Sequence, residues 1–197
     1  ERVIEDHVSK TPNLQAGLLA QLYRETGRRE EAVAVLQRAL LVSLLEAQAA
    51  MASMAPMVDN DRLDDLAKLG EALQPDEAFV SLFPTLMSTI RLQKAKNFAR
   101  EGSVEEALRA LELFVDALDG ACSVMPNPVN PGIFDKVEDM LWAEADEATA
   151  DVRADAVAEL RVAYAASLET EEAWAAIRDD ERFAQIISRV SGHEGRE

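Results

Sequence analysis

Four basic side chains lie close together in an otherwise acidic chain, and they are the first candidates for chemistry. Residues 91–100 read RLQKAKNFAR and contain no acid, although the chain of 197 residues has a formal net charge of −17. Two cations one helical turn apart can hold a carboxylate of a ligand through charge-assisted hydrogen bonds. The alternative is that these cations pair with the chain's own excess of acids.

The residues that most often catalyse reactions give weak signals. His7 and His193 lie near opposite ends of the chain, and neither has a metal-binding partner at helical spacing. Cys122 has no histidine near it in the sequence, so a buried or loop thiol is favoured over a nucleophile. A single cysteine also excludes an internal disulfide and is typical of a reducing compartment. We therefore predict a protein that is not an enzyme.

Three acids, Asp59, Asp61 and Asp64, resemble the start of a calcium-binding loop. Such a loop has glycine at its sixth position and glutamate at its twelfth. Here the sixth residue is Asp64, and the twelfth is Gly70. Helix capping explains these acids better, and no glycine-rich phosphate-binding motif is present. The sequence predicts no metal and no cofactor.

Composition predicts a helical protein. Hydrophobic residues make up 48% of the chain, with Ala, Leu and Glu dominant and only 8 Gly and 7 Pro. The acidic charge opposes nucleic-acid binding by this chain, because a binder must neutralise phosphates. The longest apolar run, residues 39–45, is interrupted by Ser43 and is shorter than a membrane span. We therefore expect a cytoplasmic protein without membrane contact.

Helix-ending residues divide the chain into elements. The segment PNPVNPG, residues 126–132, cannot form regular structure and is the clearest boundary. We predict a repeat region over residues 1–125, a loop over 126–132 and a C-terminal cap region over 133–197. The predicted helices span about 12–26, 28 to beyond 46 and 60–72. Pro75 and Asp76 then restart the chain, Pro84 kinks or restarts it, and a helix runs to about Arg100. The later predicted helices span about 104–118, 133–145, 150–168, 171–178 and 181–190.

Two stretches share one pattern, ETGRREEAVAVLQRAL at residues 25–40 and REGSVEEALRALELFV at residues 100–115. When Gly27 is aligned with Gly102, four further pairs match: Tyr23 with Phe98, Ala20 with Ala95, Ala32 with Ala107, and Leu36 with Leu111. Glycine ends a helix readily, and alanines allow two helices to approach closely. Each stretch therefore predicts a helical hairpin whose remaining apolar side must stack on a neighbour.

Residues 13–46 resemble the tetratricopeptide repeat, a pattern of about 34 residues. The match rests on Leu19, Ala20, Tyr23, Ala32 and Leu36. Residues 88–121 resemble it through Ala95, Phe98, Gly102, Ala107 and Leu111. The resemblance implies an all-α fold of antiparallel hairpins stacked as a right-handed superhelix with a C-terminal helical cap. An unrelated α-helical bundle is the alternative.

The resemblance also implies a groove lined by the first helix of each repeat. The residues that match the groove positions are Gln21, Arg24, Lys96 and Arg100. The expected ligand is a peptide or protein, with an acidic one favoured by the cations. The family's two-carboxylate clamp is not reproduced, since Gln21 and Arg24 differ from it. Met51, Met54 and Met57 are core residues or, alternatively, an adaptable surface for partners.

The C-terminal part resembles the end of certain bacterial regulators, in which a helix-turn-helix domain precedes a tetratricopeptide-like sensor. Ile177, Asp180, Arg182 and Phe183 carry the match. The resemblance implies the sensing or scaffolding half of a regulator, with a DNA-binding domain encoded before Glu1 and a homodimer as one form. A small-molecule-binding or accessory domain of an enzyme is the alternative function.

Overall fold

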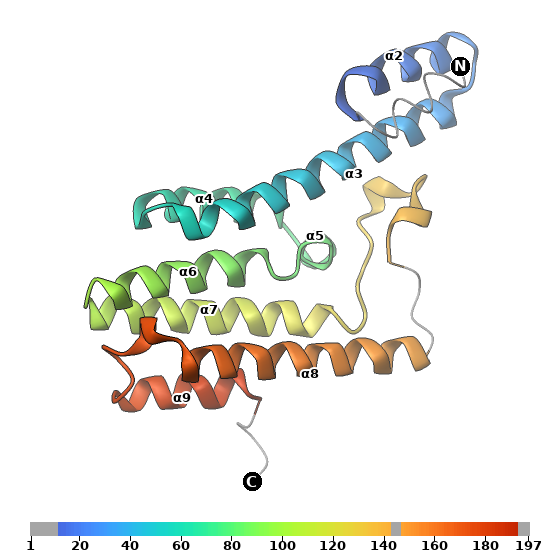
Figure 1. Ribbon diagram of the computed structural model, residues 1–197. Helices are drawn as coiled ribbons and strands as arrows, with labels where there is room; N and C mark the ends of the chain where they lie inside the picture. Colours follow the sequence, from blue (N-terminus) through green and yellow to red (C-terminus); the bar gives the residue numbers. More distant parts are fainter. Residues whose placement is uncertain (1–11, 143–146, 193–197) are drawn as a thin grey trace.

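The computed structural model describes residues 12–142 and 147–192, and this part of the chain is helical without any strand. The predicted all-α class is therefore confirmed (Figure 1). The α-helices are α2 (Pro12–Glu25), α3 (Arg29–Met54), α4 (Asn60–Leu73), α5 (Glu77–Leu82), α6 (Leu86–Arg100), α7 (Val104–Val124), α8 (Glu147–Thr170) and α9 (Glu181–Val190). Four 3-10 turns join them: η1 (Ala55–Met57), η2 (Gly132–Phe134), η3 (Glu138–Met140) and η4 (Glu172–Trp174).

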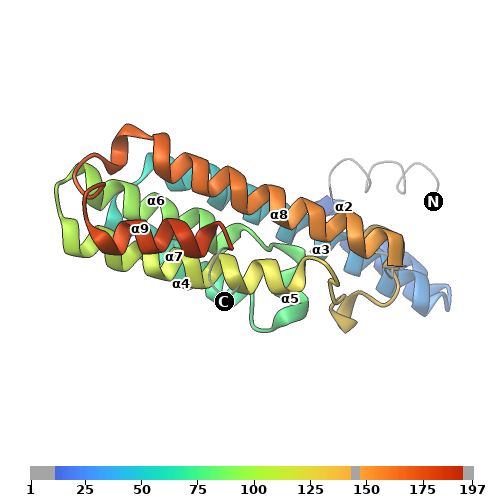
Figure 2. The same cartoon turned by 90° about the horizontal axis from the view of Figure 1, so that it is seen from below.

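The helices follow one another along the molecule as neighbouring layers (Figures 1 and 2). α2 packs on the first part of α3 at one end, and the long α3 continues to the region of α4. α4 packs on α6, α6 on α7, and α9 on both α7 and α8. The terminal hairpin α2–α3 therefore lies at the opposite end from α9.

The two aligned glycines occupy the same kind of turn. Gly27 has φ of 78° and Gly102 has φ of 75°, a left-handed conformation that favours glycine. In each turn the amide after the glycine donates to a carbonyl five residues earlier, as in a Schellman motif. The two bonds run from Arg28 N to Tyr23 O at 2.7 Å and from Ser103 N to Phe98 O at 2.9 Å. The prediction of two equivalent helical hairpins is confirmed.

The matched alanines lie where each pair of helices meets. Ala20 and Ala32 are buried between α2 and α3, and Ala95 and Ala107 are buried between α6 and α7. A methyl side chain at these places lets the two helix backbones approach closely. The close packing predicted from the alignment is therefore confirmed.

Acids at the starts of helices act as caps. Asp59 accepts a hydrogen bond from Arg62 N at 3.0 Å, and Asp76 accepts one from Phe79 N at 3.1 Å. Asp64 instead pairs with Lys94 on α6. The predicted capping role is confirmed for Asp59.

The three methionines at the end of α3 and in η1 differ in burial. Met51 lies in the core, whereas Met54 and Met57 are exposed.

The helix predicted over residues 133–145 is wrong. The chain forms the short turns η2 and η3 there, and residues 143–146 lie outside the described part. Phe134 and Val137 are both buried against Leu41 of α3. Side chains three residues apart face the same way in a 3-10 turn, so this burial needs no α-helix.

The helix predicted over residues 171–178 is also wrong, for the same reason. Only the turn η4 forms, and Trp174 and Ile177 are buried in the core cluster that also contains residues of α6 and α7. Trp174 stacks near Phe183, with ring centroids 6.0 Å apart. Asp180 then caps α9 by accepting from Arg182 N at 2.9 Å. These residues form the C-terminal covering of the α6–α7 hairpin.

α3 and the turn after it, residues 29–57, are long and apolar enough to cross a membrane by length and composition. Ser43 does not prevent this, because the apolar window still has a mean hydropathy of 1.4, and 22% of it is buried. A helix that packs within a globular fold passes the same test, and α3 contacts α2, α6 and η2. A cytoplasmic location stays a prediction.

Candidate peptide-binding groove

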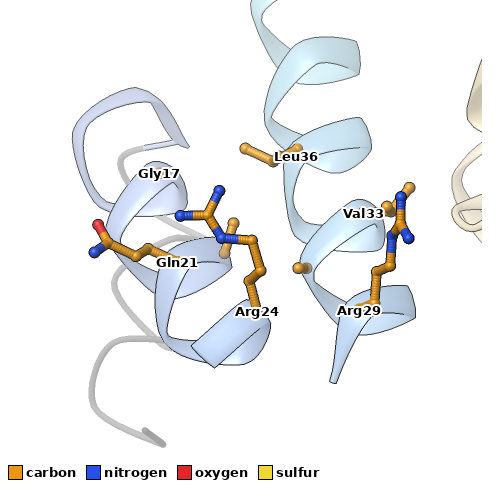
Figure 3. A pocket seen from close by; sticks show the side chains of 8 residues that line it. Gly17, Gln21, Arg24, Arg29, Val33 and Leu36 are labelled. Atoms are coloured by element: carbon orange, nitrogen blue, oxygen red, sulfur yellow. The ribbon is translucent and has the colours of Figure 1, made fainter. Parts of the chain in front are cut away.

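A groove of about 570 Å³ lies on the face shared by α2 and α3 (Figure 3). Its lining residues all belong to the terminal hairpin. They are Gly17, Ala20, Gln21 and Arg24 from α2, and Arg29, Ala32, Val33 and Leu36 from α3.

Helical spacing explains why these residues share one face. The α2 residues are spaced at i, i+3, i+4 and i+7, and the α3 residues repeat the same spacing. The turn at Gly27 sets the two stripes side by side. Ala20 and Ala32 lie at the contact between the helices, and Val33 and Leu36 leave apolar surface exposed. The floor of the groove is therefore apolar.

The groove has positive charge and no acid among its lining residues. Arg24 and Arg29 have no ion-pair partner within residues 12–142 and 147–192. Figure 3 shows the Arg24 guanidinium over α2, beside the space between the two helices, and Arg29 beside Val33 on α3. Guanidinium groups placed in this way can bind carboxylates of a ligand over an apolar floor.

Gln21, the other predicted groove residue of α2, also lines the groove. Its amide points away from α3 in Figure 3, and Nε2 donates to Oε1 of Glu25 at 2.8 Å. The structure thus brings Gln21 and Arg24 together on one face. Lys96 and Arg100 lie on α6, in the other hairpin, and are not part of this groove.

Lys96 is already paired within the chain. Its Nζ lies 2.7 Å from Oε2 of Glu171, at the start of the C-terminal covering. Burial acts to raise the pKa of Glu171, but hydrogen bonds from Lys96 and Ser167, together with the charge of Arg100, leave it below its usual value. A ligand carboxylate at Lys96 would therefore have to displace Glu171. Ligand binding by Lys96 and Arg100 stays a prediction.

Two other cations of the basic segment, Arg91 and Lys94, are engaged in the same manner. Arg91 donates to the carbonyl oxygen of Leu113 at 3.0 Å and to Oε1 of Glu71 at 3.2 Å. Lys94 pairs with Asp64. The alternative of internal pairing therefore describes Arg91, Lys94 and Lys96.

Arg29 and Leu36 belong to the groove although sequence reasoning did not select either as a site residue. The signal was present in the aligned turns. The chain reverses at Gly27, so the face of α2 that contains Arg24 continues onto the first residues of α3. Reading both helices of the hairpin, rather than the first helix alone, would have found them.

The remaining chemical candidates have structural roles or lie outside the described residues. Burial raises the pKa of the Cys122 thiol, which opposes formation of a nucleophilic thiolate. Within the described part, no group of three His, Cys, Asp or Glu residues could hold a metal ion. His7 and His193 lie outside that part.

A second cavity of about 210 Å³ lies where α8 meets the loop after α7. The indole Nε1 of Trp142 donates to the carbonyl oxygen of Ser81 at 3.0 Å and fixes one wall. Arg153 lies over the Trp142 ring, 5.4 Å from its centroid. The other lining residues are Pro84, Met125, Pro128 and Ala156.

Comparison of the chain with protein-family models, curated proteins and solved structures gives no match.

Proposed function

We propose that this chain is a non-catalytic protein-interaction module that binds a peptide segment of a partner protein in the α2–α3 groove. The groove carries the proposal, because it combines an apolar floor with Arg24 and Arg29, which have no ion pairs in the described part of the chain. Exposed apolar surface beside charged groups is typical of a protein-interaction site.

The proposal includes a tetratricopeptide-like arrangement, in which the two hairpins belong to one right-handed superhelical stack. The equivalent turns at Gly27 and Gly102 and the buried alanines beside them support it. The region between the hairpins differs from a regular repeat, since α3 alone has 26 residues. The stack would therefore contain an irregular middle unit.

We further propose that the chain is the sensing or scaffolding half of a bacterial regulator, acting as a homodimer with a DNA-binding domain encoded before Glu1. Two residues that carry the resemblance to such regulators support this role. Asp180 caps α9, and Phe183 of α9 is buried in the core. The isolated chain should not shift DNA in a gel, because of its net charge of −17. An upstream reading frame encoding a catalytic domain would contradict the regulator role.

A selection from a random peptide library tests the interaction role. The library is panned against the full chain and, in parallel, against the variant Arg24→Glu with Arg29→Glu. We expect enriched peptides that bind the chain and lose binding to the charge-reversed variant. Binding should also weaken as salt rises, because exposed charges are screened.

A matched control is the variant Arg109→Glu, which reverses an exposed arginine on α7. It should bind the selected peptides as the unchanged chain does. If no peptide is enriched, or if all enriched peptides bind the Arg24/Arg29 variant equally well, the proposed function is wrong.

The second candidate is small-molecule binding at the Trp142 cavity. Its fixed indole wall favours a flat apolar ligand. Its volume of about 210 Å³ is below the range of roughly 300–1,000 Å³ that is usual for ligand pockets. The groove on α2–α3 is therefore the stronger candidate. Saturable quenching of tryptophan fluorescence by a small apolar compound, lost in Trp142→Phe but kept in Trp174→Phe, would favour the cavity.

A further inference from the structure

The groove on α2–α3 has an equivalent face on the α6–α7 hairpin. Because Gly27 and Gly102 occupy equivalent turns, adding 75 to each groove residue gives its counterpart. The counterparts are Leu92, Ala95, Lys96, Ala99, Val104, Ala107, Leu108 and Leu111. The two faces differ in burial: Leu36 is 49% exposed, whereas Leu111 is 0% exposed.

The C-terminal segment of the chain covers the α6–α7 face. Leu108 and Leu111 share a core cluster with Trp174 and Phe183. The turn η4 contacts α6, and Glu171 just before it pairs with Lys96. The covering segment thus places the Glu171 carboxylate beside Lys96 of α6. Three residues later it places the Trp174 ring in the apolar cluster with Leu108 and Leu111.

Within the described residues, no segment covers the α2–α3 face in this way, and both Val33 and Leu36 stay exposed. The two faces also differ in residue type at two aligned positions. Gly17 stands where the other hairpin has Leu92, which leaves room above the floor. Arg24 stands where the α6–α7 hairpin has Ala99. The cation of α2 therefore lies three residues after Gln21, the residue that aligns with Lys96.

We infer that the groove binds an acidic amphipathic helix of a partner protein, which lies on α2–α3 as η4 and α9 lie on α6–α7. This inference rests on the proposed function and specifies its ligand. A carboxylate of the helix accepts hydrogen bonds from the Arg24 guanidinium, and an apolar side chain enters the space above Gly17. Recognition of a helix in a groove places such anchors at i, i+3, i+4 and i+7.

Charge favours this partner over a second copy of the same face. A two-fold contact between two α2–α3 faces would place Arg24 and Arg29 of both copies in one interface, where their like charges repel. The lining residues include no acid to offset that repulsion. A partner helix with acids beside its apolar stripe removes the repulsion and covers the same surface.

The peptides enriched by the library selection test the inference separately from the function. We expect acids and large apolar residues at helical spacing, and few prolines. Two peptides made from the strongest binder then serve as probes, one with its acid changed to the amide and one with a central residue changed to proline. The full chain should bind each at least about tenfold more weakly than the parent peptide.

The variants Arg24→Gln and Arg109→Gln locate the acid's contact. With Arg24→Gln, the acid and amide peptides should bind equally, whereas Arg109→Gln should keep the full difference. Enriched peptides that bind through Arg24 but tolerate the central proline would overturn the inference and leave the function standing. A chain that dimerises, and becomes monomeric when Leu36→Asp is introduced, would overturn it in favour of a second copy.

Discussion

The ammonium of Lys96 and the carboxylate of Glu171 lie 2.7 Å apart, although 75 residues separate them in the chain. The pair joins α6 to the start of the C-terminal covering, and the Lys96 side chain is only 16% exposed. It explains how a basic segment in an acidic chain can have a structural role, and it gives the first prediction.

Changing Lys96→Met should lower the free energy of unfolding by about 1–2 kcal/mol, because Glu171 loses a charged partner at a partly buried place. Urea denaturation measures the change. The control Lys68→Met removes a pair with both side chains exposed, at 74% and 77%. It should cost clearly less than Lys96→Met does, because solvent screens an exposed pair. Equal effects of the two variants would contradict a special role for the Lys96–Glu171 pair.

The stabilisation by this pair should depend on pH in one direction. The pKa of Glu171 is lowered in the folded chain, so the pair contributes fully above the ordinary pKa of 4.5. Its contribution is lost as pH falls through the lower folded pKa. The difference in stability between the unchanged chain and Lys96→Met should therefore shrink on acidification. A difference that grows at acid pH would contradict this sign.

Gly102 and Gly120 should respond to alanine with opposite signs. Gly102 has φ of 75°, which alanine adopts only with strain, so Gly102→Ala should destabilise the chain by about 1 kcal/mol. Gly120 lies within α7, and a Cβ added there would meet open space. Gly120→Ala should stabilise by about 0.5–1 kcal/mol, because alanine favours helix. Thermal denaturation of the two variants measures both effects.

The equivalent alanines of the two hairpins should tolerate leucine differently. Ala107 is 0% exposed beneath the C-terminal covering, so Ala107→Leu should overpack the core and cost about 1–3 kcal/mol. Ala32 is also buried but borders the groove, into which a larger side chain can extend. Ala32→Leu should therefore cost less and should weaken binding of the selected peptides. Equal losses of stability would contradict this difference between the two alanines.

Removing the Gln37 side chain on α3 should raise the pKa of Asp135. Its Nε2 donates to Oδ1 of Asp135 at 2.7 Å, and its Oε1 accepts from Lys136 N at 2.8 Å. The first bond is the main reason that the pKa of Asp135 lies below its usual value. In Gln37→Leu this pKa should rise, as measured by carbon NMR of the carboxyl group. An unchanged titration would contradict the contact.

The alignment of Gly27 with Gly102 was enough to predict both hairpins, because the conformation of these turns is encoded locally by glycine. The same holds for Asp59, which caps the helix that follows it. The turns η2 and η4 were not predictable in this way. Phe134 and Trp174 have helical spacing to their neighbours, and only contacts with distant residues decide that a 3-10 turn buries them.

The candidate site was predictable in part. Arg24 was selected from the repeat pattern, and it lines the groove. Lys96 was selected from the same pattern, but its partner Glu171 lies 75 residues later, so the sequence could offer internal pairing only as an alternative. The exposure of Leu36 could not be predicted from the sequence for a related reason. Burial depends on which segment covers a hairpin, and the hairpin's own sequence does not contain that segment.

The continuous course of α3 has a mechanical consequence. With 26 residues, this helix is about 39 Å long. Its first half forms one wall of the groove, and its second half contributes Met51 to the core shared with α4 and α6. Because α3 is one uninterrupted helix, the wall of the groove and the segment that packs in the distant core belong to a single rigid element.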